Sequence, residues 1–184
     1  MEKYKRIKQE IAYRAHVFDV YNDYLELPDG REVVYDLIKH KAGACVLPVM
    51  DNGDIVLVKQ YRNSIDAVTF EAPAGFIDEG ETPDEAAARE LREETGYMAE
   101  KLIYVTKAVL AIGTSDEQTY IYIGKELNKG RRNLDDNEFI DCERIDILKA
   151  EDMIRTGVVV DSKTIIAIYA YKNMILKSNI DKNL

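Results

Sequence analysis

Three glutamates in one short segment could bind a divalent cation. Glu90 and Glu94 are four residues apart and Glu93 is three residues after Glu90, so on a helix the three carboxylates share one face. Like charges this close repel one another and destabilise a helix unless cations lie among them. Hard divalent ions such as Mg²⁺ prefer oxygen ligands and bridge to substrate phosphates. The segment therefore indicates a metal site suited to phosphate chemistry.

The same segment has the start and stop signals of a helix. Thr82 is a good N-cap, Pro83 suits the first helical position, acidic residues follow in the first turn, and Gly96 supplies a C-terminal stop. These signals predict a helix between Thr82 and Gly96. A Glu-rich stretch near arginine is in most proteins only a solvated helix face with ion pairs, so the wider pattern must decide.

The rest of the chain predicts strands around a few helices. Asn52-Gly53 between two apolar runs predicts a hairpin turn, and Pro28-Asp29-Gly30 a second turn. Strand-like runs cover residues 4–39, 44–50, 55–62, 102–112 and 119–123, and helical periodicity covers 147–155 and 163–176, the last preceded by Asp161 as a cap. This order predicts an α+β fold with a mixed or antiparallel sheet, in which residues 1–41 form a small antiparallel extension and residues 42–184 the main domain.

Composition excludes several classes of function. The net charge of −9 argues against binding to a nucleic-acid backbone, which depends on basic residues. The charged N-terminus is no secretion signal, and no run of about 18 apolar residues could span a membrane. Two cysteines, Cys45 and Cys142, fit a reducing compartment as structural thiols. We therefore expect a soluble, cytoplasmic protein with no nucleic-acid or membrane partner.

Nucleophilic serine or cysteine chemistry is disfavoured. The chain has no Gly-x-Ser-x-Gly pattern, and its only histidines, His16 and His40, lie in strand-like segments where a structural role is expected. The glutamate segment is the better candidate for a reactive site.

The glutamates belong to a longer motif. From Gly75 to Tyr97 the chain matches Gly-x5-Glu-x7-Arg-Glu-U-x-Glu-Glu-x-Gly-U, where U is a bulky apolar residue, with Leu91 at the first U and Tyr97 a mild departure at the second. On these positions the chain resembles the Nudix hydrolase family. The resemblance implies an α/β/α sandwich with a mixed sheet. It also implies water attack on the pyrophosphate of a nucleoside diphosphate linked to another group, with Mg²⁺, or alternatively Mn²⁺, as cofactor and more than one ion per site.

The resemblance assigns roles to individual residues. Glu90 and Glu94 match the family's metal ligands, joined by the main-chain carbonyl of Ala74, and Glu93 matches a further ligand or base. Arg89 matches the position that orients the glutamates. Glu81 matches a supporting position.

Other segments resemble the ADP-ribose pyrophosphatase branch of the family, and with them the resemblance spans most of the chain. These segments are Lys59-Gln60-Tyr61-Arg62, Glu71-Ala72-Pro73-Ala74-Gly75 and Gly113-Thr114-Ser115-Asp116-Glu117. They imply that Arg62 contacts the substrate diphosphate and that Glu117 positions or deprotonates the water. Gly75 suits a turn where the backbone comes close to a metal or phosphate. The N-terminal extension implies a homodimer. The resemblance to this branch also implies that the substrate is ADP-ribose, which is cleaved to AMP and ribose 5-phosphate.

Two departures leave the substrate open. Ala111-Ile112-Gly113 stands where the branch usually has Ser-Pro-Gly, and Tyr35-Asp36 lacks the preceding arginine that helps hold phosphate across the dimer. Another nucleoside diphosphate sugar, such as GDP-mannose, is the nearest alternative. A catalytically silent nucleotide-binding sensor is a further alternative, although three intact, mutually repelling glutamates argue against it.

Overall fold

The computed structural model describes residues 2–134 and 139–181, with side chains up to residue 178. The chain forms two compact units. One comprises the residues up to Ala42 together with Val109–Gln118, and the other comprises Gly43–Ala108 and the chain from Thr119 onward.

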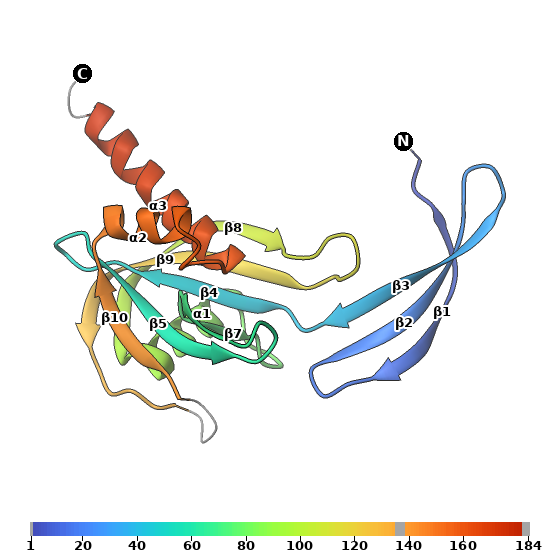
Figure 1. Ribbon diagram of the computed structural model, residues 1–184, viewed down its shortest axis with the longest axis horizontal. Coiled ribbons are helices and arrows are strands. Elements are labelled where there is room, and N and C mark those ends of the chain that lie inside the picture. The colour runs from blue at the N-terminus through green and yellow to red at the C-terminus, as the bar shows by residue number, and fades with distance from the viewer. Residues whose placement is uncertain (1, 135–138, 182–184) are drawn as a thin grey trace. The chain divides into compact units, whose positions relative to one another are not determined.

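The N-terminal unit is an antiparallel sheet with strand order β1-β2-β3. Its strands are β1 (Lys5–Arg14), β2 (Phe18–Glu26) and β3 (Glu32–His40), seen in blue in Figure 1. The predicted turn at Pro28-Asp29-Gly30 joins β2 to β3, and Gly30 adopts a φ of 83° there. Residues 109–118 attach to this unit through Ile38, whose backbone bonds to Thr114 and Asp116. The alternating N-terminal sequence thus forms the antiparallel sheet it predicts.

The second unit contains two sheets and three helices. Its elements are β4 (Gly43–Pro48), β5 (Ile55–Arg62), β6 (Ala67–Glu71), β7 (Ala74–Phe76), α1 (Pro83–Thr95), β8 (Tyr97–Val109), β9 (Gln118–Lys129), β10 (Asp141–Ile145), α2 (Ile147–Arg155) and α3 (Ser162–Asp181). One sheet has the order β7-β4-β9-β8, with β4 parallel to β9 and antiparallel to β7. The other has the antiparallel order β10-β5-β6. The predicted mixed sheet is confirmed.

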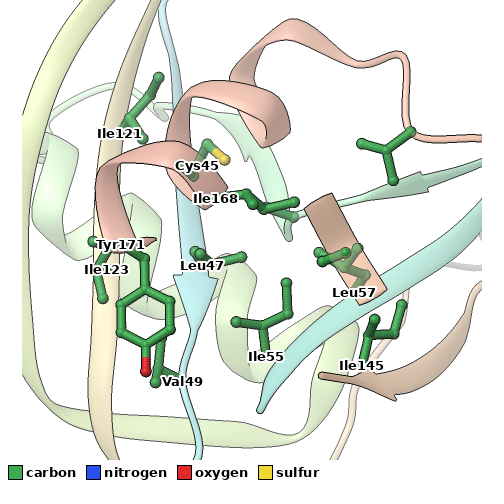
Figure 2. Packing of buried hydrophobic residues seen from close by; sticks show 14 of the residues in the cluster. Cys45, Leu47, Val49, Ile55, Leu57, Ile121, Ile123, Ile145, Ile168 and Tyr171 are labelled. Carbon is green, nitrogen blue, oxygen red and sulfur yellow. The ribbon is translucent and has the colours of Figure 1, made fainter. Parts of the chain in front are cut away.

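Strand β4 separates the two halves of the core. Cys45 and Leu47 pack into a cluster with Ile168 of α3, and the alternate residue Val46 packs with Leu91 of α1. All five side chains are fully buried, and the larger cluster appears in Figure 2. Because successive strand residues point to opposite faces, α1 covers one face of this sheet and α2 and α3 the other. This is the α/β/α sandwich that the resemblance implied.

The predicted hairpin around Asn52-Gly53 forms only at its turn. Gly53 adopts a φ of 92°, and an isolated bridge joins Val49 to Ile55. Beyond that bridge β4 and β5 part into different sheets, because β4 pairs instead with β7 and β9. Periodicity cannot distinguish these partners, since β4 and the first half of β5 are both continuous apolar runs.

Aspartate side chains cap the starts of both C-terminal helices, and of the two only Asp161 was predicted from the sequence. Asp146 accepts hydrogen bonds from Leu148 and Lys149 at the start of α2. At the start of α3, Asp161 Oδ2 accepts from the Thr164 backbone N–H at 3.0 Å. Among residues 2–134 and 139–181, none of the helices combines the length and apolarity needed to cross a bilayer.

Candidate active site

The glutamate segment forms helix α1, and both ends of this helix are capped. At its start Thr82 and Glu85 form a capping box, in which each side chain bonds to the backbone of the other residue. At its end Gly96, with a φ of 74°, donates its N–H to the Arg92 carbonyl. The local signals in the sequence therefore predicted both boundaries correctly.

Two of the three motif glutamates lie on the buried face of α1. Glu90 is 9% exposed and Glu94 is 3% exposed, whereas the side chain of Glu93 is 24% exposed. Buried carboxylates require compensating donors or cations. One donor is the backbone N–H of Ala74 in β7, which lies 3.2 Å from Glu94 Oε2.

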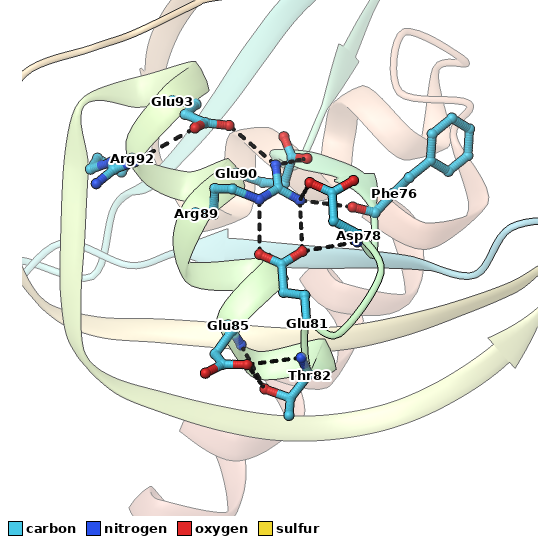
Figure 3. Close-up of polar contacts among 9 residues, drawn as sticks. All are labelled: Phe76, Asp78, Glu81, Thr82, Glu85, Arg89, Glu90, Arg92 and Glu93. Atoms are coloured by element: carbon cyan, nitrogen blue, oxygen red, sulfur yellow. Dashed lines mark hydrogen bonds and ion pairs between the residues drawn. The ribbon is translucent and has the colours of Figure 1, made fainter.

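Arg89 joins the glutamates into one network, shown in Figure 3. Its Nη1 donates to Glu90 Oε1 at 2.6 Å and to Glu93 Oε2 at 3.2 Å. Its Nε and Nη2 donate to the two carboxylate oxygens of Glu81 at 2.9 and 3.0 Å, and Nη2 also donates to the Phe76 carbonyl at 2.8 Å. A planar guanidinium with five donors suits this fork-like arrangement, which lysine could not reproduce. Arg89 thus contacts both Glu90 and Glu93, and its role in orienting them for catalysis stays a prediction.

The charges in this network reinforce one another. Hydrogen bonding to Glu81 raises the pKa of Arg89 above its ordinary value even though burial opposes it. In return, the Arg89 guanidinium lowers the pKa of the Glu81 carboxyl. Both groups are therefore charged at neutral pH, and the Arg89–Glu81 pair fixes α1 to the loop that precedes it.

Gly75 of β7 lies close to the Glu90 carboxylate. A Cβ atom at residue 75 would lie 1.9 Å from Glu90 Oε1 and 2.3 Å from Glu90 Cδ. No side chain fits in that space without displacing the carboxylate. The requirement for glycine is thus steric: the backbone of β7 lies directly against Glu90.

The carbonyl of Ala74 points toward the same side as the buried glutamates. In an antiparallel strand the N–H and C=O of one residue point in the same direction, and successive residues alternate. The Ala74 N–H faces Glu94, whereas the Pro73 carbonyl faces β4, where it accepts from the Val46 N–H at 2.9 Å. Ala74 therefore directs its carbonyl oxygen away from β4, to the side on which its own N–H meets Glu94.

This arrangement fits a hard divalent cation. Two buried carboxylates and one directed main-chain carbonyl supply only oxygen donors, which Mg²⁺, Mn²⁺ and Ca²⁺ prefer. In the part of the chain that the structure describes, His, Cys, Asp and Glu side chains form no ready-made cluster of three ligands. Here Arg89 Nη1 bonds to both Glu90 and Glu93. The residues brought together here are Ala74, Gly75, Arg89, Glu90 and Glu94, with Glu93 at the margin.

Arg62 lies in a second polar network at the ends of β5 and β6. Its Nε and Nη2 donate to the two oxygens of Glu71 at 2.7 and 2.8 Å. Glu71 is 3% exposed and also accepts from Thr69 Oγ1 at 2.6 Å and from Lys163 Nζ at 2.8 Å. Burial alone would raise the pKa of Glu71, but Arg62 and Lys163 outweigh it and lower the pKa to about 2. Sequence reasoning singled out Arg62 but not Lys163, because a lone lysine at the start of a helix carries no motif.

The C-terminal end of α1 is held from a distant part of the chain. The backbone N–H of Asn133 donates to the Glu93 carbonyl at 3.1 Å, and Cys142 Sγ contacts the Glu94 carbonyl at 3.3 Å. These contacts satisfy carbonyls that a helix end would leave without partners. Cys142 thus has a structural role here, but its spacing in the sequence gave no indication of which helix it would contact.

Glu117 belongs to the N-terminal unit rather than to the unit that contains α1. Its backbone N–H donates to Ser115 Oγ at 3.1 Å, which shapes the loop before β9. Its role as a water-positioning residue stays a prediction.

An α/β/α sandwich with a capped, glutamate-rich helix against a glycine loop defines the class of protein. The model of the NUDIX domain family matches residues 39–167, and the chain belongs to this family. The family recognised from the motif is thereby confirmed, and its members use divalent metal ions.

Several known proteins align with this chain over most of their own length. An ADP-ribose pyrophosphatase from Bacillus subtilis is 36% identical over 89% of this chain and 90% of its own length. A methanol dehydrogenase activator from Bacillus methanolicus is 33% identical with the same coverage. An ADP-ribose pyrophosphatase from Mycobacterium tuberculosis is 30% identical over 91% of this chain and 82% of its own length. A crystal structure of an ADP compounds hydrolase superposes with a TM-score of 0.88 at 22% identity, covering 97% of both chains, which supports the fold.

Proposed function

We propose that the protein hydrolyses the pyrophosphate bond of a nucleoside diphosphate sugar in a Mg²⁺-dependent reaction, and that ADP-ribose is cleaved to AMP and ribose 5-phosphate. The names of two relatives that align over most of their length, from Bacillus subtilis and Mycobacterium tuberculosis, support this substrate. Two free thiols, Cys45 and Cys142, are compatible with the reducing cytoplasm as its location.

One observation carries the proposal. Arg89, Glu81 and Gly75 together hold the Glu90 carboxylate against the β7 backbone, while Ala74 bonds to Glu94 from the same strand. An ordinary ion-paired helix face would expose its glutamates to solvent, whereas Glu90 and Glu94 are buried. Two buried carboxylates beside a main-chain carbonyl supply the oxygen ligands that a hard divalent cation prefers.

Metal binding, proton transfer and diphosphate binding would fall to different residues of the chain. Bound Mg²⁺ would neutralise phosphate charge and lower the pKa of water, so that attack occurs near neutral pH. Glu90, Glu94 and the Ala74 carbonyl would hold the ions, and Arg89 keeps Glu90 and Glu93 oriented between turnovers. Glu93, the more exposed glutamate, would act as a further ligand or accept the water proton, with Glu117 as the second candidate base. Arg62 would bind the diphosphate.

The test is product release from a panel of substrates with and without Mg²⁺. The panel contains ADP-ribose, GDP-mannose, other nucleotide sugars, dinucleoside polyphosphates and NADH. We expect Mg²⁺-dependent release of AMP from ADP-ribose. Preferential cleavage of GDP-mannose would move the substrate to the alternative nucleotide sugar. Silence across the panel, together with nucleotide binding by calorimetry, would replace the hydrolase with a nucleotide sensor.

We also propose that the N-terminal sheet, residues 1–41, is a dimerisation element. A sheet of three strands is stable on its own only if it has an apolar face to bury. The unit exposes several large apolar side chains, among them Ile11 (42%), Val34 (54%) and Tyr35 (49%). Light scattering coupled to gel filtration should give the mass of a dimer, and Val34→Asp should shift it to the monomer. A monomeric wild-type protein would contradict this assignment.

A further inference from the structure

The start of α3 contacts the network that holds Arg62. Lys163 Nζ donates to Glu71 Oε2 at 2.8 Å and to Asp161 Oδ1 at 2.9 Å. The Lys163 side chain is only 13% exposed, and Asp161 is 17% exposed. A buried lysine with two carboxylate partners is a fixed component of the structure rather than a mobile surface group.

Glu71 transmits this contact to Arg62. Its Oε2 receives bonds from both Lys163 Nζ and Arg62 Nη2, and its Oε1 receives a bond from Arg62 Nε. The carboxylate plane is therefore fixed from both sides, and a bidentate pair transfers that orientation to the guanidinium. The Arg62 side chain remains 40% exposed and has three N–H donors beyond the two used by Glu71.

Arg62, Glu71, Lys163 and Asp161 form a network with no net charge. Alone, Glu71 would neutralise Arg62 and weaken its attraction for a diphosphate. Lys163 offsets the charge of Glu71, and Asp161 offsets the charge of Lys163. Arg62 is the most exposed charged side chain of this balanced network, and its guanidinium is therefore the group that an anion can reach.

The same turn of α3 also holds the strand that leads to the glutamates. Thr164, which is fully buried, accepts a hydrogen bond from the Ala72 N–H at 2.7 Å. Ala72 follows Glu71 directly and precedes Ala74 by two residues. The first turn of α3 is thus attached to the segment 71–74 at two points, one of them the carboxylate that orients Arg62.

From these contacts we infer that Lys163 is a positioning residue for substrate binding, which acts through Glu71 to hold the Arg62 guanidinium toward a diphosphate. The inference rests on the role of Arg62 in the proposed function. It adds a residue from α3, outside every motif considered above, to the determinants of substrate affinity.

A double-mutant cycle with ADP as probe tests this inference. Affinity for ADP is measured by calorimetry in EDTA, so that no divalent ion contributes. Lys163→Met should weaken binding by about tenfold, as expected when a residue that orients a ligand-binding group is lost. Arg62→Met should weaken it at least as much, and the double variant no more than Arg62→Met alone.

Matched variants exclude a general structural effect. Lys172 lies on the same helix and is ion-paired with Glu151, so Lys172→Met should leave ADP affinity unchanged. Lys163→Arg keeps the charge and should restore part of the affinity. If Lys163→Met does not fold, Lys163→Arg replaces it in the cycle, with a smaller effect that again disappears in the Arg62→Met background.

Steady-state kinetics with ADP-ribose and Mg²⁺ provide a second readout. Lys163→Met should raise KM by a factor similar to its loss of ADP affinity, while kcat stays within about twofold of the wild type. Loss of hydrolysis in the wild type would refute the proposed function but leave the ADP cycle decisive. The inference is overturned if Lys163→Met weakens ADP binding equally with and without Arg62, or not at all. It is also overturned if the wild type binds ADP no better than Arg62→Met.

Discussion

Replacing Glu71 by glutamine should destabilise the protein at neutral pH and much less in acid. The pKa of Glu71 falls from an ordinary value of 4.5 to about 2 in the folded chain, because Arg62 and Lys163 outweigh the effect of burial. A carboxyl whose pKa is lower in the folded state contributes stability that is fully present above the unfolded pKa. That contribution disappears as the pH falls through the folded pKa.

The magnitude follows from these two pKa values. One pH unit between the unfolded and folded pKa is worth about 1.4 kcal/mol, so the interval from 4.5 to about 2 corresponds to about 3 kcal/mol. Glutamine resembles the protonated acid in shape and charge, so Glu71→Gln should lower the free energy of unfolding by about this amount at pH 7. Below pH 4.5 the difference in the free energy of unfolding between Glu71→Gln and the wild type should narrow by about 1.4 kcal/mol per pH unit.

Urea unfolding followed by circular dichroism, from neutral pH to about pH 3, measures the free energy of unfolding of the variant and of the wild type at each pH. Glu143→Gln is the matched control, because Glu143 is 3.7 Å from Lys149 in an exposed pair. Exposed pairs of this kind contribute little, so the control should change the free energy of unfolding by less than about 1 kcal/mol at every pH. A difference between Glu71→Gln and wild type that does not vary with pH would refute the electrostatic explanation.

Three further perturbations test the site and the core. Glu94→Gln should lower turnover by several orders of magnitude with an unchanged circular dichroism spectrum, and near-normal turnover would contradict its role as a metal ligand. Gly75→Ala should weaken Mn²⁺ binding in calorimetry, because the new Cβ would lie 1.9 Å from Glu90 Oε1; an unaltered affinity would show that this contact is unimportant. Cys45 is fully buried and burial raises the pKa of its thiol to about 12, so maleimide followed by mass spectrometry should label Cys142 first and Cys45 only on unfolding. Equal labelling rates in the native protein would refute this packing.

Local signals made the motif helix predictable from sequence. Thr82, Pro83 and Gly96 act on their immediate neighbours, so the boundaries of α1 depend on little else. Glu90 and Glu94 could likewise be placed on one face from their spacing alone. The family motif then supplied their chemistry, which spacing could not provide.

Features that depend on distant segments were not predictable. The hairpin at Asn52-Gly53 parts after the Val49–Ile55 bridge because β4 finds partners elsewhere in the chain. The contact between Lys163 and Glu71 spans 92 positions and needs the folded core to bring α3 to β6. Neither residue carries a pattern that would identify its partner. Sequence reasoning therefore found the chemical groups but missed part of the structure that orients them.

The parallel pairing of β4 with β9 has a consequence for the order of folding. Gly43 pairs with Thr119, so this sheet closes only after a long loop that includes α1 has formed, and such closures are slow. Until then the apolar side of α1 lacks Tyr122, one of its packing partners from β9. Pulse-labelled hydrogen exchange during refolding should show amides of β4 and β9 becoming protected together, later than those of the β5–β6 hairpin. Simultaneous protection of both pairs would contradict this order. A helix that concentrates so much negative charge would thus acquire its final surroundings only near the end of folding.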